Sequence, residues 1–253
     1  MRMASQKGIF PLEGTLGGVN FYYRKGKAVA RKSGGGFNGM AIKTKDSMVR
    51  VRENGSEFGS VSKVKKMIRM SVEQELLYVK DGTLHGRMMS VLQEVKVCDL
   101  ISDRGSRMVW KGLKTAEGKK LLTDFLFVPK QAVFFLFASF SVVVLDGKKC
   151  DVGNLTAPQL VFKGSATHLC LHYFVVDYDV EALTFKKNSA EKVLISKEEF
   201  SGALPPFEVV DLPLTFSTRM AFLSVQFYQE KNGGLFELKE NGMAGVRCLL
   251  VME

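Results

Sequence analysis

The sequence feature that most constrains the fold is a glycine-framed stretch near the N-terminus, GTLGGVNFYYRKGKAVARKSGGG, from Gly14 to Gly36. Two runs of β-forming residues flank a Lys-Gly-Lys turn, in which Gly26 supplies the positive φ angle that a tight hairpin requires. The glycine clusters on both sides interrupt regular structure, because glycine loses more entropy than other residues in a helix or strand. The stretch therefore predicts a separate β-hairpin, which is too small to be stable by itself.

The positive charge of the chain is concentrated in the same region. The whole chain has a net charge of +10, but residues 1–70 hold fifteen Lys or Arg and four Asp or Glu, a net charge of +11. The remainder carries a net charge of −1. This asymmetry indicates an arm that meets a polyanion or an acidic partner surface, and the alternative is a solvated basic face.

The composition favours a folded protein in a reducing compartment. Apolar residues make up 46% of the chain, which is enough to bury a core. The four cysteines are far apart and form no CxxC pair, which argues against a disulfide scaffold. The N-terminal residues lack the apolar run of a signal peptide. The most apolar run, Ala132 to Leu145, is too short for a membrane-spanning helix of roughly 20 residues, so we interpret it as a buried strand.

A change of hydrophobic period follows the arm. Residues 40–52 predict an extended basic segment, and residues 53–56 predict a turn. From Phe58 to Val79, apolar residues recur every three or four positions, which is the spacing of one buried helix face, and Ser56 is placed to cap the helix. The opposite face of this predicted helix carries Lys63, Lys65, Lys66 and Arg69.

Further helices and then strands are predicted along the rest of the chain. A second helix from Thr83 to Val97 would form an antiparallel pair with the first, and residues 114–127 predict a third. From Ala132 onward, short β-rich runs alternate with Asn-Gly and Asp-Gly turns, which is typical of an antiparallel sandwich. The predicted strands are 133–145, 159–162, part of 167–177, 192–195, 207–212, 220–230 and 246–252.

These patterns predict an α+β fold with three sections. Residues 1–55 form a basic β-hairpin arm and connector, residues 56–128 form a helical section with an antiparallel helix pair, and residues 129–253 form an antiparallel β-sandwich-like domain.

The best candidate for a metal-ligand pattern is the run His168-Leu-Cys170-Leu-His172. In a strand these three side chains project from one face, and imidazole and thiolate suit zinc or copper. However, the outer two would lie about 13 Å apart at roughly 3.3 Å per residue, too far to share one ion without a bulge. We interpret the run as one face of a half-buried strand and expect no metal and no cofactor.

No motif predicts catalysis. Asp177, Asp179 and Glu181 lie close together at a predicted strand end, where a solvated loop is favoured over a divalent-cation site. The glycine clusters match neither phosphate-binding loop pattern, and no GxSxG sequence is present. We therefore expect that the protein is not an enzyme.

The arm combines aromatic side chains with basic ones, as proteins that bind single-stranded nucleic acids do. Because no sequence-reading motif is present, such binding would be directed at the backbone. The candidate residues for binding a partner or a nucleic acid are Phe21, Tyr22, Tyr23, Arg24, Lys25, Lys27, Arg31, Lys32, Arg50, Arg52, Lys63 and Lys66.

The pairing of GTLGGVNFYYRKGKAVARKSGG with VRENGSEFGSVSKVKKMIR resembles uncharacterised basic proteins of Bacteroidota and their phages or integrated elements. The resemblance covers about residues 1–70. It implies a structural or assembly component, which would lie in the virion if the protein is phage-derived. The composition and the lack of a signal peptide predict a cytoplasmic location otherwise.

Three function classes follow. The first is a non-enzymatic structural or assembly protein whose basic arm docks on other protein subunits, including copies of itself, by adding strands to a sheet edge. The second is a sequence-nonspecific DNA- or RNA-binding protein that uses the same arm. The third is a β-sandwich that binds a carbohydrate or another small ligand. None of them requires a membrane.

Overall fold

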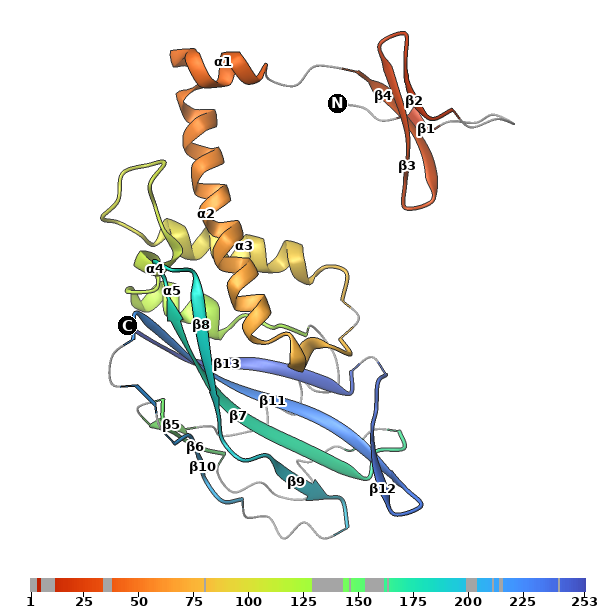
Figure 1. Cartoon of the computed structure of the whole chain (residues 1–253), viewed down its shortest axis with the longest axis vertical. Helices are drawn as coiled ribbons and strands as arrows, with labels where there is room; N and C mark the ends of the chain where they lie inside the picture. Colours follow the sequence, from red (N-terminus) through yellow and green to blue (C-terminus); the bar gives the residue numbers. More distant parts are fainter. Residues whose placement is uncertain are drawn as a thin grey trace. The chain divides into compact units, whose positions relative to one another are not determined.

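The computed structural model describes residues 4–5, 12–33, 38–79, 81–128, 143–145, 147–152, 162, 164–198, 204–210, 212–213, 216–240 and 242–253. The chain divides into two compact units, Met1–Arg52 and Glu53–Glu253. The predicted α+β class is confirmed, with an N-terminal antiparallel sheet, helices in the middle and a C-terminal antiparallel sheet (Figure 1). Within the described residues, no helix is long and apolar enough to cross a membrane.

The first unit contains a four-stranded antiparallel sheet in the order β1-β4-β3-β2. Its strands are β1 (Ala4–Ser5), β2 (Gly14–Leu16), β3 (Val19–Arg24) and β4 (Lys27–Lys32). Both tight hairpins have two-residue turns with positive φ angles, at Gly17-Gly18 and at Lys25-Gly26. These angles give the primed turns whose twist matches that of paired strands, so the predicted hairpin is present and gains two further strands.

Residues 40–52 were expected to be extended, and this prediction is wrong. They form α1 (Gly39–Thr44), the short 3-10 helix η1 (Asp46–Met48) and the start of α2 (Val49–Ser71). The Asn38 side chain caps α1 by accepting a hydrogen bond from the Met40 amide. Arg52 donates to the carbonyl oxygens of Ile42 and Lys45, and these bonds hold the end of α1 against the first turn of α2.

The predicted turn at residues 53–56 is also wrong, because α2 continues through it. Glu57 explains why: its carboxylate is buried and binds Lys96, Arg107 and the Gly105 amide, so this turn of the helix is fixed by tertiary contacts. These contacts outweigh the helix cost of Gly55, about 1 kcal/mol. The helix ends at Ser71, earlier than the predicted Val79.

The remaining helices follow the predicted periodicity more closely. After η2 (Gln74–Leu76), α3 covers Leu84–Val97 and runs across α2 (Figure 1). Two short helices, α4 (Val109–Gly112) and α5 (Ala116–Thr123), complete the helical section. Thr115 caps α5 by accepting a hydrogen bond from the Gly118 amide.

Two long strands, β7 (His168–Asp179) and β11 (Thr218–Lys231), form the centre of a six-stranded antiparallel sheet. β7 pairs with β9 (Val193–Ser196) along its first part and with β8 (Thr184–Ser189) along its second. β11 pairs with β13 (Ala244–Met252) and, near its end, with β12 (Gly234–Glu237). A separate three-stranded sheet contains β5 (Val143–Leu145), β6 (Lys149–Asp151) and β10 (Phe207–Glu208).

The large sheet is covered on both faces, so most of β7 and β11 is buried. The helices pack on the face that carries Phe174 and Phe222. The three-stranded sheet packs on the other face, against Tyr173 and Leu223. Burial on both sides explains the nearly continuous apolar sequence of these strands. Residues 133–142 and 159–161, which were expected to be strands, lie outside the described residues, and the sequence patterns did not predict β6, β8 and β12.

Candidate binding surfaces

The N-terminal sheet has two chemically different faces. Residues opposite each other on paired strands point to the same side, and Phe21 pairs with Ala30 while Tyr22 pairs with Val29. The first face is therefore apolar, apart from Lys32, and we call it the apolar face. It consists of Leu16, Val19, Phe21, Tyr23, Ala28, Ala30 and Lys32.

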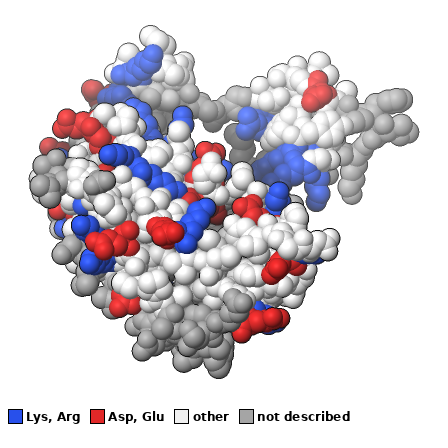
Figure 2. Space-filling view, turned by 60° about the horizontal axis from the view of Figure 1, so that its bottom comes forward, with Lys and Arg blue, Asp and Glu red and all other residues white. Residues whose placement is uncertain are grey.

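The second face, which we call the cationic face, gathers the basic residues around one aromatic ring. Arg24 pairs with Lys27, and Arg31 pairs with Asn20. The Arg31 guanidinium lies 5.7 Å from the centre of the Tyr22 ring, a cation–π geometry. Figure 2 shows that blue Lys and Arg side chains outnumber acidic ones on the N-terminal unit, whereas red and blue residues are mixed over the larger unit. The cationic face consists of Asn20, Tyr22, Arg24, Lys27, Val29 and Arg31.

No residue between positions 12 and 33 is buried. Leu16 is 69% exposed and Tyr23 is 47% exposed, while Val19 and Phe21 are half-buried. Both hydrophobic clusters of buried residues lie in the second unit. The described part of this sheet therefore has no core of its own.

The other predicted residues of the first unit differ in their roles. Lys25 lies at the tip of the hairpin with a φ angle of 50°, and it is exposed. Arg50 is exposed in the first turn of α2. Arg52 is engaged in hydrogen bonds to the backbone, which gives it a structural role in joining α1 to α2.

Lys63 and Lys66 lie in the second unit, on the exposed side of α2, between two surface hollows. One hollow, of about 640 Å³, also contains Phe58, Arg69 and Met70. The other, of about 580 Å³, is completed by Met67, Leu183 and Phe185.

Lys65 does not share this exposed side, although the helical pattern placed it there. Its side chain is buried, and its Nζ lies 2.7 Å from Nδ1 of His85 on α3. Burial lowers the pKa of Lys65, and the nearby charge of Arg69 lowers it further. Lys65 therefore belongs to the packing of α2 on α3.

His168, Cys170 and His172 project from one face of β7, as the strand pattern predicted. Across the sheet they lie opposite Tyr228, Gln226 and Ser224 of β11. Among the described residues, no three His, Cys, Asp or Glu side chains are grouped closely enough to hold a metal ion.

The acidic residues at the end of β7 are engaged in local structure. Asp177 forms a buried two-point ion pair with Arg219, whose guanidinium also lies 4.1 Å from the centre of the Phe216 ring. Asp179 accepts hydrogen bonds from the amides of Glu181 and Ala182 and so fixes the turn.

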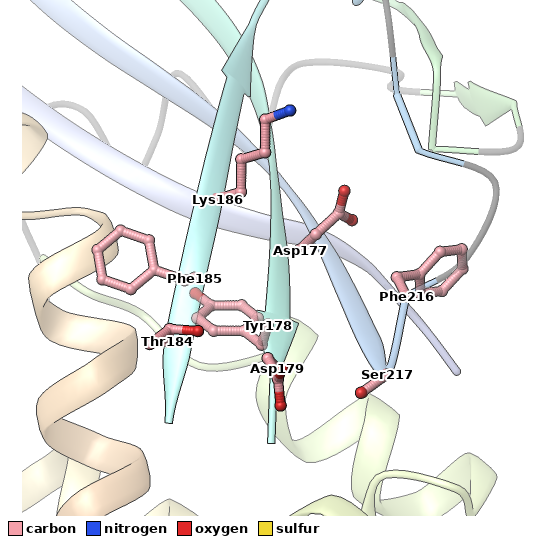
Figure 3. Close-up of a pocket in the computed structure, with 8 residues that line it drawn as sticks. All are labelled: Asp177, Tyr178, Asp179, Thr184, Phe185, Lys186, Phe216 and Ser217. Carbon is pink, nitrogen blue, oxygen red and sulfur yellow. The ribbon is translucent and has the colours of Figure 1, made fainter. Parts of the chain in front are cut away.

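Asp177, Asp179 and Phe216 line an open pocket of about 530 Å³ (Figure 3). Asp177 and Phe216 lie on one side of β7, whereas Tyr178 and Phe185 extend toward α2. Because Asp177 is already paired with Arg219, we assign a structural role to this carboxylate. The interpretation of the acidic run as a loop therefore applies to Glu181, while Asp179 is the last residue of β7 and Asp177 is a buried strand residue.

The sequence patterns missed the residues that meet the histidine strand from elsewhere in the fold. Glu75 of η2 and Lys187 of β8 form a short ion pair, with 2.6 Å between Nζ and Oε1, beside His172. Glu75 and Lys187 are more than a hundred positions apart in the sequence, so no local pattern could predict their contact. The only sequence signal was the alternation of polar residues along β7, which indicated that one face of the strand is polar.

Comparisons with protein-family models, with curated proteins and with solved structures gave no match to this chain. The assignment of a function therefore depends on the geometry of its own residues.

Proposed function

We propose that the protein is a non-enzymatic structural or assembly component whose N-terminal sheet docks on a partner subunit. The observation that supports this most directly is the absence of buried residues between positions 12 and 33, although that segment forms a regular sheet with an apolar face. Leaving apolar area in water forgoes about 25 cal/mol per Å², so contact with a second protein surface would stabilise the sheet.

The apolar face would supply the contact area of this interface. Phe21 and Tyr23 lie side by side on it with the small residues Ala30 and Ala28 opposite them, and Tyr23 is exposed while Phe21 is half-buried. Aromatic side chains of this kind dominate the energetics of protein interfaces. Lys32 is at the edge of the face, where a charge can stay in water.

Self-association is the form of docking to test first, by sedimentation velocity over a wide concentration range. We expect the wild-type chain to associate and the double variant Phe21→Ser/Tyr23→Ser to remain monomeric. The matched control, Arg24→Ser/Arg31→Ser, alters the cationic face of the same two strands and should still associate. A strictly monomeric wild type whose N-terminal sheet resists proteolysis would contradict docking on a second copy.

A second candidate function is nucleic-acid binding through the cationic face. The Arg31–Tyr22 contact and the neighbouring Arg24 and Lys27 combine a stacking ring with charges that can meet phosphates. A fluorescence-anisotropy titration with labelled single-stranded DNA should then show affinity that falls steeply with salt.

The two double variants separate these functions. If the cationic face binds DNA, Arg24→Ser/Arg31→Ser should reduce the slope of log affinity against log salt by about 1.4, since each single-strand phosphate contact contributes about 0.7. Phe21→Ser/Tyr23→Ser should leave that slope unchanged. No binding of the wild type at low salt would exclude this second function.

A further inference from the structure

The exposed side of α2 carries the two neighbouring hollows described above, of about 640 Å³ and about 580 Å³. Lys63, Lys66 and Met70 line both of them, so the hollows lie next to each other along the helix. The first also contains Phe58, and the second is completed by Leu183 from the turn between β7 and β8. We call the two hollows together the α2 surface.

Three exposed cations, Lys63, Lys66 and Arg69, follow each other along this surface at a spacing of three residues. Residues three positions apart on a helix are neighbours, so these like charges repel each other. Among the described residues, none of the three forms an ion pair, and Glu73 is the one carboxylate that lines either hollow. The α2 surface therefore carries an excess of positive charge that the described part of the chain does not neutralise.

Large apolar side chains are exposed among these cations. Phe58 is 57% exposed, Met70 is 50% exposed and Leu183 is 41% exposed. Met67 is buried and Phe185 is half-buried, and both line the second hollow, so its apolar lining continues below the surface. The Phe185 ring extends toward α2 (Figure 3). Exposed apolar side chains that are grouped and surrounded by polar ones are typical of an interaction site.

Leu183 adds a separate observation, because its backbone conformation is one that leucine rarely adopts. Its φ angle is 55°, in the left-handed region that glycine and asparagine accommodate far better. The side chain is exposed, so burial does not offset this cost within the unit. A strained position that holds an apolar side chain in water beside α2 indicates a contact outside the chain.

The chemistry of the α2 surface favours one class of partner. The phosphates of a nucleic acid would use the cations, but Met70 and Leu183 offer no ring on which a base can stack. A flat lipid surface would leave the two hollows unfilled. A helix that carries carboxylates beside apolar side chains matches both the charge and the concave apolar lining.

We propose that the α2 surface binds an acidic amphipathic helix of a partner protein. The apolar side chains of that helix contact the exposed apolar residues of the surface, and its carboxylates pair with the three cations. Phe58 and Met70 are twelve positions apart on α2, about 18 Å at 1.5 Å per residue, so a helix of about 14 residues covers the surface. The surface belongs to the second unit, so this site is independent of the function proposed for the N-terminal sheet.

The experiment is a fluorescence-anisotropy titration of the full chain against a labelled, designed peptide of about 14 residues, with Leu and Phe on one helical face and Glu on the other. We expect micromolar binding at low salt. A control peptide with Gln in place of every Glu should bind about tenfold more weakly or less, because it forms no ion pair. No binding of the acidic peptide, or equal binding of the two peptides, would overturn the proposal.

A charge-reversal variant locates the binding on α2. Lys63→Glu/Lys66→Glu changes two exposed positions and keeps good helix formers there, so the fold should be retained. It should weaken binding of the acidic peptide by about tenfold or more. The matched control, Arg24→Ser/Arg31→Ser, removes two cations from the N-terminal sheet and should leave the affinity unchanged. A loss of binding in the control alone would place the peptide on that sheet and overturn the proposal.

Leu183→Asn tests the apolar contact separately from the charge. Asparagine tolerates the φ angle of this position better than leucine, so the variant should raise the thermal midpoint of the second unit and still bind the acidic peptide several-fold more weakly. The control Leu100→Asn removes a leucine that is 87% exposed and lines neither hollow, and it should not change the affinity. Unchanged affinity in Leu183→Asn would overturn the proposal.

Two further probes test the other classes of partner. Labelled single-stranded DNA and phosphatidylserine vesicles present phosphates without an acidic helix. We expect any binding of either probe to persist in Lys63→Glu/Lys66→Glu. If either probe binds the wild type more tightly than the acidic peptide does, and this variant abolishes that binding, the proposal is overturned.

Discussion

The two units of this protein contain similar antiparallel sheets but stabilise them in different ways. In Glu53–Glu253, helices cover one face of the large sheet and a second sheet covers the other, so Phe222 and Leu223 are both fully buried. In Met1–Arg52, the sheet has regular pairing and well-formed turns, but residues 12–33 contain no buried side chain. Hydrogen bonding and turn geometry are therefore sufficient to specify a sheet, whereas burial decides how much a side chain contributes to its stability.

The largest expected effect on stability comes from comparing a phenylalanine of the large sheet with a phenylalanine of the N-terminal sheet. Phe222→Ala should lower the free energy of unfolding of the second unit by about 3–5 kcal/mol, because Phe222 is fully buried, stacked on Phe174 and in edge contact with Phe127. Phe21→Ala should change it by less than about 0.5 kcal/mol, since Phe21 lies in the other unit.

Urea unfolding followed by tryptophan fluorescence measures this contrast cleanly. Trp110 is the single tryptophan, and it is buried in the second unit beside Tyr178. Equal destabilisation by Phe21→Ala and Phe222→Ala would show that the two sheets unfold as one cooperative body.

A buried carboxylate gives the next largest effect. Glu57→Gln should destabilise the second unit by about 3 kcal/mol, because it leaves the buried Lys96 ammonium without its charge partner. Glu53→Gln is the matched control on the same helix. It removes a partly exposed ion pair with Arg104 and should cost less than about 1 kcal/mol.

The pH dependence of stability tests the same group. Burial alone would raise the pKa of Glu57, but hydrogen bonds from Arg107, Lys96 and the Gly105 amide lower it to about 2. A folded-state pKa below the ordinary value of 4.5 gives stability that is present above pH 4.5 and is lost as the pH falls toward 2. Urea midpoints measured through this range should fall in the wild type and fall less in Glu57→Gln.

His172 predicts a smaller effect in a different pH window. Its folded-state pKa of about 4 is below the ordinary value of 6.5, so the unfolded chain takes up a proton first as the pH falls. The wild type should therefore lose stability from pH 6.5 toward pH 4, and His172→Gln should reduce that loss. An NMR titration midpoint near 6.5 for the His172 ring would contradict the buried environment assigned to it.

The smallest effects concern the hairpin turn of the first unit. Lys25 has a φ angle of 50°, which asparagine tolerates better than lysine, so Lys25→Asn should stabilise the hairpin by about 0.5 kcal/mol. Gly26→Ala should destabilise it by about 1 kcal/mol through backbone strain alone, since a Cβ at this position would contact nothing. Hydrogen exchange of the β3 and β4 amides in the full chain should slow in the first variant and accelerate in the second.

Local patterns predicted the parts of the fold in which local physics dominates. The Lys-Gly-Lys turn predicted the hairpin of β3 and β4, and the three- to four-residue period predicted α3 at Leu84–Val97. The period-two alternation placed His168, Cys170 and His172 on one face of β7. The prediction failed at residues 40–56, where turn-forming residues such as Asn54 and Gly55 are held in a helix by the tertiary contacts of the neighbouring Glu57.

The sequence by itself determined the concentration of charge in residues 1–70, the primed hairpin turn at Lys25-Gly26 and the α+β order of elements. These properties depend on composition and on neighbours within a few positions. Only the tertiary structure decided that the N-terminal sheet has separate apolar and cationic faces, because strand register sets which residues share a side. It also brought Glu75 next to His172 and Lys187, since contacts between residues about a hundred positions apart depend on packing that no local pattern encodes.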